Sequence, residues 1–350
     1  MKWIILIVCI VLIACSEQKA TVGVMLPLTG ISAALGQNVR QGIELAENQS
    51  SHPLNIVFED DACDAKQGVT AAQKLIDVDH VAAILGPICT TAILSSLQLV
   101  EDAHTPRITT GLVLQKTANA GSYHFSFLPE MKHQMNAIAA FKPHAAFGVI
   151  AVNDDLGKES IAELKRALVE QGGSVVAEEY FERADTDFRA QLLRINSKNP
   201  DSIYLMGYVP NLAGLVRQIH ELGIEQPIFT WSLFQDPSIL ALNSTVEGVI
   251  YTYPEDPRAL PVKIAFRAAF KQKFGKEPEL YAANAYDSYN ILANAVETCG
   301  YDKECIKTAL EHLGAYEGAN GFITLDERGV GQRVEVTVKT VKDGKFVALA

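Results

Sequence analysis

The stretch ILGPICTTAILSSL, residues 84–97, decides the fold class. Its apolar start predicts a buried strand that stops at Gly86, and its second half predicts a helix that begins at Thr90 or Thr91. The turn between them carries a thiol, Cys89, and two hydroxyls. Ligands of open α/β sheets bind at the carboxyl ends of strands, where such a turn lies. The stretch therefore predicts a strand–turn–helix unit whose turn either holds a small molecule or supplies a nucleophile.

The same strand–helix alternation runs along the chain from residue 21 in two series. Short apolar strands separated by helices of about 10–15 residues are typical of parallel sheets that are covered on both faces. The first series predicts strands at 21–26, 54–60, 81–86 and 106–110, with helices at 34–49, 64–77 and 90–103. The second predicts strands at 145–152, 174–181, 201–207 and 227–231, with helices at 156–173, 187–199 and 209–223. Two such series predict an α/β protein of two similar lobes, each a doubly wound parallel sheet.

A Pro-rich, acidic stretch at 251–261 interrupts the second series. Beyond it the pattern predicts three helices and a terminal pair of strands, at 263–275, 280–300, 305–314, 321–329 and 332–349. A chain of 350 residues is too long for one small core, which agrees with two domains.

The N-terminal segment resembles a bacterial lipoprotein signal. A basic start is followed by an apolar run that ends at Ala14 and is shorter than the roughly 20 residues of a membrane-spanning helix. The run closes in LIAC, so we expect a signal peptide at 1–14, a lipidated Cys15 and a short linker at 15–20. An ordinary signal peptide cut near Ala14 or Ala20 is the alternative. A lipid anchor would hold the protein on a membrane of the cell envelope, facing the periplasm or the cell exterior.

Composition and cysteine usage indicate an exported globular protein. The chain is 48% hydrophobic and 20% charged, and its net charge of −11 argues against a nucleic-acid partner. Four cysteines remain beyond the N-terminal segment, and they favour disulfides over a metal site, because the CxxC spacing of structural zinc is absent. Four cysteines allow three pairings. Cys299 and Cys305 flank a turn and can meet locally, which leaves Cys63 with Cys89.

Two neighbouring segments resemble the leucine/isoleucine/valine-binding protein family. They are EDDACDAKQGVTAAQKLI at 59–76 and LGPICTTAI at 85–93. Further family-like stretches are PLTGISAALGQNVRQGIELA at 27–46, YAANAYDSYNILANAVE at 281–297 and GFITLDERG at 321–329. The resemblance covers essentially the whole chain after the signal. Proteins of this family are periplasmic substrate-binding proteins of ABC importers.

The resemblance implies two α/β lobes joined by a three-strand hinge, the type I periplasmic binding protein fold, with a ligand held in the cleft between them. The first lobe is expected to comprise 21–128 plus 255–320, and the second 129–254 plus 321–350. In the family the two cysteines of the quoted segments form a disulfide, which matches the Cys63–Cys89 pairing. No cofactor or metal is implied.

Several family ligand positions are retained. Thr90 stands where the family places a hydroxyl on the ligand carboxylate, beside the unpaired N–H groups of a helix start. Thr91 follows and could share this contact, although plain N-capping is the alternative for both threonines. Gly111 aligns with a position that offers main-chain groups to the ligand. Tyr208 matches a tyrosine that closes over the ligand, and a buried structural tyrosine is the alternative.

Other family positions differ in this chain. Val113 stands where a threonine helps to hold the ligand amino group, and Leu35 and Leu156 stand at two aromatic positions. The glutamate that pairs with the ligand ammonium is replaced by Trp231, with Ser232 beside it.

These departures leave the carboxylate half of an amino-acid site and remove the ammonium half. Burying an ammonium without a counter-charge is costly. We therefore expect an uncharged amide or an apolar or aromatic carboxylate as ligand. A carboxylate elsewhere, such as Asp236, is the alternative that would restore the binding of an α-amino acid.

The leading prediction is a monomeric, lipid-anchored solute-binding protein that closes over its ligand and presents it to an ABC permease and its ATPase. A ligand-sensing receptor of the same fold, which delivers to a signalling partner, is the alternative. An enzyme that uses Cys89 or a threonine as nucleophile would need a base within hydrogen-bond reach, and no histidine lies in a motif beside this turn. We therefore expect no enzymatic activity.

Overall fold

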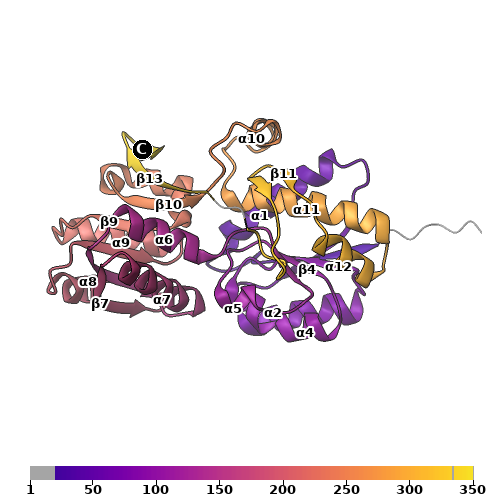
Figure 1. Ribbon diagram of the computed structural model, residues 1–350, viewed down its shortest axis with the longest axis horizontal. Coiled ribbons are helices and arrows are strands. Elements are labelled where there is room, and N and C mark those ends of the chain that lie inside the picture. The colour runs from indigo at the N-terminus through magenta and orange to yellow at the C-terminus, as the bar shows by residue number, and fades with distance from the viewer. Residues whose placement is uncertain (1–19, 333–334, 350) are drawn as a thin grey trace, which may run out of the picture.

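The computed structural model describes residues 20–332 and 335–349, which form two α/β lobes side by side (Figure 1). The sheet of the first lobe has the strand order β2-β1-β3-β4-β5, and neighbouring strands are parallel. Its strands are β1 (Thr21–Leu26), β2 (Asn55–Asp60), β3 (Ala83–Leu85), β4 (Arg107–Thr109) and β5 (His124–Ser126). The predicted signal peptide and Cys15 lie outside the described residues.

Helices from both ends of the chain cover the first sheet. Its early helical segments are α1 (Ala33–Gln49), α2 (Ala65–Gln73), the π-helix η1 (Lys74–Val78), α3 (Thr90–Ser95), α4 (Leu97–Asp102) and α5 (Gln115–Ala118). Later in the chain come α10 (Pro261–Phe274), α11 (Leu280–Cys299) and α12 (Lys303–Glu311). A Cβ at Gly42 of α1 would lie 2.1 Å from the carbonyl oxygen of Ala282, so α1 and α11 pack backbone against backbone. The first lobe is therefore completed by helices that come after the second lobe in the sequence.

The second lobe repeats the strand order of the first. The run β7-β6-β8-β9-β10 has the same arrangement as β2-β1-β3-β4-β5, and β13 and β14 extend it. The strands are β6 (Ala146–Val152), β7 (Ser174–Phe181), β8 (Ser202–Met206), β9 (Ile228–Thr230), β10 (Ile250–Pro254), β13 (Val336–Lys342) and β14 (Lys345–Ala348). Helical segments are α6 (Met131–Phe141), α7 (Asp155–Glu170), α8 (Arg189–Asn196), α9 (Val209–Glu221) and the 3₁₀ segments η2 (Ser232–Gln235) and η3 (Pro237–Val246). The prediction of two doubly wound sheets is confirmed.

Two predictions about single elements are wrong. The stretch at 251–261, taken as an interruption, begins with most of strand β10, because Pro254 is the last residue of the strand and interrupts no ladder inside it. The strand predicted at 332–349 is two strands, β13 and β14, which are antiparallel to each other. The strand predicted at 321–329 is reduced to β12 (Gly321–Ile323), which pairs with β11 (Tyr316–Gly318), while β13 is also antiparallel to β10.

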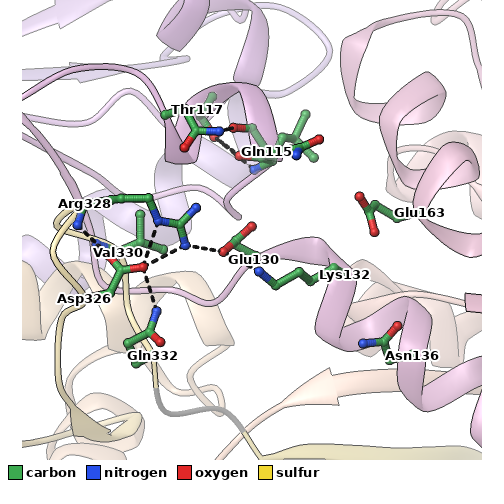
Figure 2. A network of polar contacts seen from close by, with 12 residues as sticks. Gln115, Thr117, Glu130, Lys132, Asn136, Glu163, Asp326, Arg328, Val330 and Gln332 are labelled. Atoms are coloured by element: carbon green, nitrogen blue, oxygen red, sulfur yellow. Dashed lines mark hydrogen bonds and ion pairs between the residues drawn. The ribbon is translucent and has the colours of Figure 1, made fainter. Parts of the chain in front are cut away.

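The chain crosses between the lobes three times: after β5, after β10 and before β13. An ion cluster joins the first and third crossings (Figure 2). Glu130, the N-cap residue of α6, accepts from Arg328 at 2.6 Å and from Lys132 at 2.7 Å, and Arg328 also pairs with Asp326 at 2.7 Å. Val330 still bridges to β5, so the chain remains with the first lobe beyond the boundary predicted at residue 320.

Two disulfides brace the first lobe. Cys63 pairs with Cys89, with 5.3 Å between their Cα atoms, and Cys299 pairs with Cys305, with 5.6 Å. These are the pairs expected from the sequence. Among the described residues, no helix is long and apolar enough to cross a membrane.

Candidate ligand-binding site

A cavity lies between the two lobes. The first lobe contributes Leu35, Ile88, Cys89, Thr90, Leu112 and Tyr281, and the second contributes Leu156, Tyr208, Trp231 and Leu233. Most of these residues follow the carboxyl end of a strand: β1, β3 and β4 in the first lobe, and β6, β8 and β9 in the second. This is the edge at which doubly wound sheets bind ligands. The cavity therefore combines the binding edges of both sheets.

The turn after β3 brings Thr90 to the cavity. Gly86 has φ +96°, and a Cβ there would lie 2.1 Å from the carbonyl oxygen of Met25, so only glycine fits at the start of this turn. Helix α3 begins at Thr90, with Cys89 as its N-cap residue and no side-chain capping bond. Thr90 is the first residue of the helix, so it is not the N-cap, and it is buried among the residues that line the cavity. Thr91 is half-buried and is not among the lining residues.

Cys89 has a structural role. Its bond to Cys63 ties the β3–α3 turn to the segment that follows β2. That segment is held by Asp61, whose Oδ1 accepts from the N–H of Cys63 at 2.8 Å. Burial raises the pKa of the Asp61 carboxyl to about 6. A disulfide-bonded sulfur is no nucleophile, so the turn holds the cavity wall in place.

Tyr208 is positioned by charged neighbours. Its hydroxyl donates to Oδ2 of Asp154 at 3.0 Å, and the guanidinium of Arg183 lies 3.9 Å from the centre of its ring. Burial raises the pKa of Tyr208, so the phenol stays protonated. Nη1 of Arg183 also donates to the carbonyl oxygen of Cys63 at 3.2 Å. Arg183 thus links a residue that lines the cavity in the second lobe to the disulfide segment of the first.

Trp231 forms an apolar wall on the second lobe. It is only 2% exposed, and its Nε1 donates to the carbonyl oxygen of Gly207 at 2.9 Å, which fixes the indole plane. Among the described residues, none that lines the cavity carries a carboxylate or a cationic group. Leu35 and Leu156 add further apolar surface from the two lobes. The cavity is therefore suited to an apolar body with one polar end.

Gly111 and Val113 lie outside this lining. A Cβ at Gly111 would lie 2.1 Å from the carbonyl oxygen of Ile88, so this glycine packs β4 against the ligand-side turn. Val113 is 1% exposed and clusters with Ala118 and Val330, while its carbonyl oxygen accepts from the N–H of Met131 at 2.8 Å. Val113 therefore packs where the chain first crosses from one lobe to the other.

The sequence prediction missed several lining residues. Ile88, Leu112 and Leu233 are close in the chain to predicted positions and could have been found by extending each strand-end loop. Tyr281 comes from α11, so only the return of the chain to the first lobe places it here. Asp236 lines two neighbouring chambers together with Glu279.

Comparisons with known proteins agree with this architecture. The family model described as "Periplasmic binding protein" matches residues 19–345. A Leu/Ile/Val-binding protein, BraC3, of Rhizobium johnstonii is 26% identical over 349 residues, which are 95% of this chain and 94% of that protein.

Two solved structures are similar over nearly the whole chain. The leucine binding protein LivK of Thermotoga maritima has a TM-score of 0.88 and 29% identity, covering 95% of this chain and 98% of that one. A solute binding protein from R. palustris in complex with benzoate has a TM-score of 0.86 and 18% identity, covering 95% of both chains, which shows a shared fold. Proteins of this family bind solutes and are not enzymes. The chain belongs to the periplasmic binding protein family.

Proposed function

We propose that this protein is the extracytoplasmic solute-binding lipoprotein of an ABC importer of the branched-chain amino acid type. It captures a small amino acid, amide, or apolar or aromatic carboxylate between its two lobes. The observation that carries this proposal is a cavity lined from strand ends of both sheets. A ligand that contacts both lobes favours their closure and so shifts the population toward the loaded, closed form.

The chemistry of the lining supports this ligand class. Thr90 offers a hydroxyl at one wall, and Tyr208 and Tyr281 offer phenol groups at others. The rest of the lining is apolar, with Trp231 as its largest side chain. The named ligands of the two similar structures, leucine and benzoate, are both small carboxylates with an apolar body.

The ligand class is tested by isothermal titration calorimetry. The panel pairs leucine with 4-methylpentanoate, phenylalanine with 3-phenylpropanoate, and adds benzoate and the amides of these acids. At least one member is expected to bind with a stoichiometry of one. Absence of heat with the whole panel would contradict the proposal.

The transport role has a separate test. Cells that express the protein and its permease should take up the radiolabelled ligand, and uptake should stop when the permease is deleted. Unchanged uptake without the permease would contradict the assignment to an importer.

Lipidation at Cys15 is tested by mass spectrometry, where Cys15→Ser should lose the mass of the acyl chains and release the protein from the membrane fraction.

A further inference from the structure

A buried glutamine of α6, Gln134, is hydrogen-bonded to the segment that forms one wall of the ligand cavity. Its side chain is fully buried, and its Oε1 accepts from the N–H of Ser232 at 3.2 Å and from the hydroxyl of Thr252 at 3.1 Å. Burying a polar amide costs free energy unless it is hydrogen-bonded, and these two bonds offset that cost. Gln134 therefore connects α6 both to the segment after β9 and to β10.

The bond to Ser232 fixes the backbone between two residues that line the cavity. Ser232 lies between Trp231 and Leu233, and these three residues are called the Trp231–Leu233 wall below. Ser232 is also the first residue of the 3₁₀ segment η2, and the first N–H groups of a helical segment have no acceptor within it. The N-cap residue, Trp231, supplies no side-chain bond to them. Oε1 of Gln134 supplies an acceptor from α6 instead, so the wall is held from behind.

Ser232 also contacts the opposite lobe. Burial raises the pKa of the Tyr281 phenol, and a hydrogen bond with the Ser232 side chain opposes this shift. Tyr281 belongs to α11 of the first lobe and lines the cavity. A displacement of Ser232 would therefore disturb the wall of the second lobe and a contact between the lobes at the same time.

The first turn of α6 is fixed at its other end to the hinge, where the chain crosses between the lobes. Gln134 lies one helical turn, about 5.4 Å, beyond Glu130, the N-cap residue of α6. Glu130 accepts from Arg328 at 2.6 Å in the ion cluster (Figure 2). The N–H of Met131 donates to the carbonyl oxygen of Val113 at 2.8 Å. One turn of α6 thus connects the hinge to the Trp231–Leu233 wall.

We propose that Gln134 is a positioning residue for ligand binding, which holds the Trp231–Leu233 wall in place and connects it to the ion cluster at the hinge. The inference rests on the proposed function, because it assumes that the ligand lies against this wall. Gln134 does not line the cavity, so it acts on the ligand only through the residues that it holds. Its loss should alter both the affinity for ligand and the environment of Trp231, although every lining residue is still present.

Two variants separate the hydrogen bonds of Gln134 from its volume. Gln134→Met fills a similar space but leaves the N–H of Ser232 and the hydroxyl of Thr252 without this acceptor, whereas Gln134→Glu keeps an oxygen at the same place. Calorimetry with the panel of amino acids, acids and amides should give Gln134→Met a Kd about fivefold or more above wild type for each member that binds. Gln134→Glu should bind within about twofold of wild type.

The matched control is Gln218→Met, which removes a buried glutamine from α9 of the same lobe. Gln218 is 2% exposed, accepts from the N–H of Phe188 at 2.7 Å and donates to the carbonyl oxygen of Thr186 at 2.8 Å, and it does not contact the wall. Urea unfolding should show that both methionine variants are less stable than wild type, but Gln218→Met should keep the wild-type Kd. This comparison separates the positioning of the wall from a general loss of stability.

A second measurement needs no ligand. In the protein expressed from residue 16 onward, Trp231 is the sole tryptophan. Its emission should move to longer wavelength in Gln134→Met, because a wall that is no longer held admits water to the indole. The emission should stay unchanged in Gln218→Met and in Gln134→Glu.

The connection to the hinge is tested with Arg328→Met, which removes the pair with Glu130. Alone, this substitution should change Kd by about threefold or more. In the Gln134→Met background it should have little further effect, because the turn that carries its influence is no longer attached to the wall. Effects that simply multiply in the double variant would contradict the connection.

The outcomes distinguish this inference from the proposed function. An unchanged Kd in Gln134→Met would overturn the inference while the proposed function stands. Equal losses of affinity in Gln134→Met and Gln218→Met would also contradict it, since lower stability would then explain both. If no member of the panel binds the wild-type protein, the proposed function is contradicted, and an unshifted emission of Trp231 in Gln134→Met would contradict the positioning role as well.

Discussion

Thr90 of the first lobe and Trp231 of the second line the same cavity, although neither is near the other in sequence. Thr90 follows the end of β3 and Trp231 follows the end of β9. The two sheet edges face each other, and the cavity is the space between them. The relationship predicts that substitutions on either lobe affect the same binding event. The predictions below use this geometry.

Replacing the hydroxyl of Thr90 should weaken ligand binding specifically. Thr90→Val keeps the volume of the side chain but removes the hydroxyl that we propose as donor to the ligand carboxylate, and a hydrogen bond to a charged group is worth about 1.5–3 kcal/mol. We expect a loss of affinity of roughly tenfold or more for carboxylate ligands, measured by calorimetry. Thr91→Val is the matched control, because Thr91 does not line the cavity. Equal effects of the two substitutions would refute a direct role for Thr90.

Arg183 should stabilise the closed arrangement without touching the ligand. Its hydrogen bond to the carbonyl oxygen of Cys63 joins the two lobes. Arg183→Met removes this bond, worth about 1 kcal/mol, and should raise Kd by roughly fivefold through a smaller closed population. Small-angle scattering should give ligand-free Arg183→Met a radius of gyration no smaller than that of the ligand-free wild-type protein.

The control for Arg183 is Arg194→Met, which removes a surface pair with Glu179 inside the second lobe. That variant should bind like wild type. An unchanged Kd in Arg183→Met would show that the bond between the lobes does not favour closure.

The two disulfides should contribute unequally to stability. Cys63 and Cys89 are 26 residues apart and Cys299 and Cys305 are 6 apart, and the longer loop restricts the unfolded chain more. The double serine variant of the first pair should lose about 3.5 kcal/mol of unfolding free energy, against about 2 kcal/mol for the second. Urea unfolding measures both.

Only the first disulfide adjoins the cavity, through Cys89. Its removal should therefore weaken ligand binding as well, whereas removal of the Cys299–Cys305 bond should leave Kd unchanged. Loss of binding in the second variant alone would contradict this account of the turn.

Asp287 should make the protein less stable as pH rises from about 4 to about 7. The carboxyl is fully buried in α11 and accepts from the N–H groups of Ala319 at 2.7 Å and Asn320 at 3.1 Å. Burial raises its pKa from 3.8 to about 7. Between these values the folded state binds a proton that the unfolded state has lost, so this residue's contribution to the unfolding free energy falls with rising pH, at up to about 1.4 kcal/mol per pH unit.

The comparison variant is Asp287→Asn, which cannot ionise. Its unfolding free energy relative to wild type should become steadily more favourable from pH 5 to pH 7 and level off above pH 8. A constant difference across this range, measured by urea unfolding, would show that Asp287 does not titrate near neutrality.

Much of the fold could be predicted because the parallel strands are short runs of apolar residues that end at turn-forming residues. The boundary at Gly86 and the helix start at Thr90 follow from local residue chemistry alone. Strand β10 was missed because its proline was taken as a break, whereas Pro254 closes the strand. Strand β5 and helix α6 carry short or mixed patterns that gave no signal above their surroundings.

The site could be predicted only in part. The family resemblance singles out Thr90, Tyr208, Trp231, Leu35 and Leu156, and all five line the cavity. Gly111 and Val113 are near a strand end but face the packing of the turn and the first crossing. The contributions of Tyr281 and Glu279 depend on the return of the chain to the first lobe, which no local pattern reveals.

The most direct test of a ligand held between the lobes uses Trp231 itself. The chain has two tryptophans, and Trp3 lies in the predicted signal peptide, so in the protein expressed from residue 16 onward Trp231 is the sole reporter, and it lies in the cavity wall. Titration with the best-binding member of the panel should change its fluorescence saturably, with the same Kd as calorimetry, and Thr90→Val on the opposite lobe should shift that curve by roughly tenfold. A calorimetric binding event that leaves the fluorescence of Trp231 unchanged, or that Thr90→Val does not alter, would place the ligand outside this cavity.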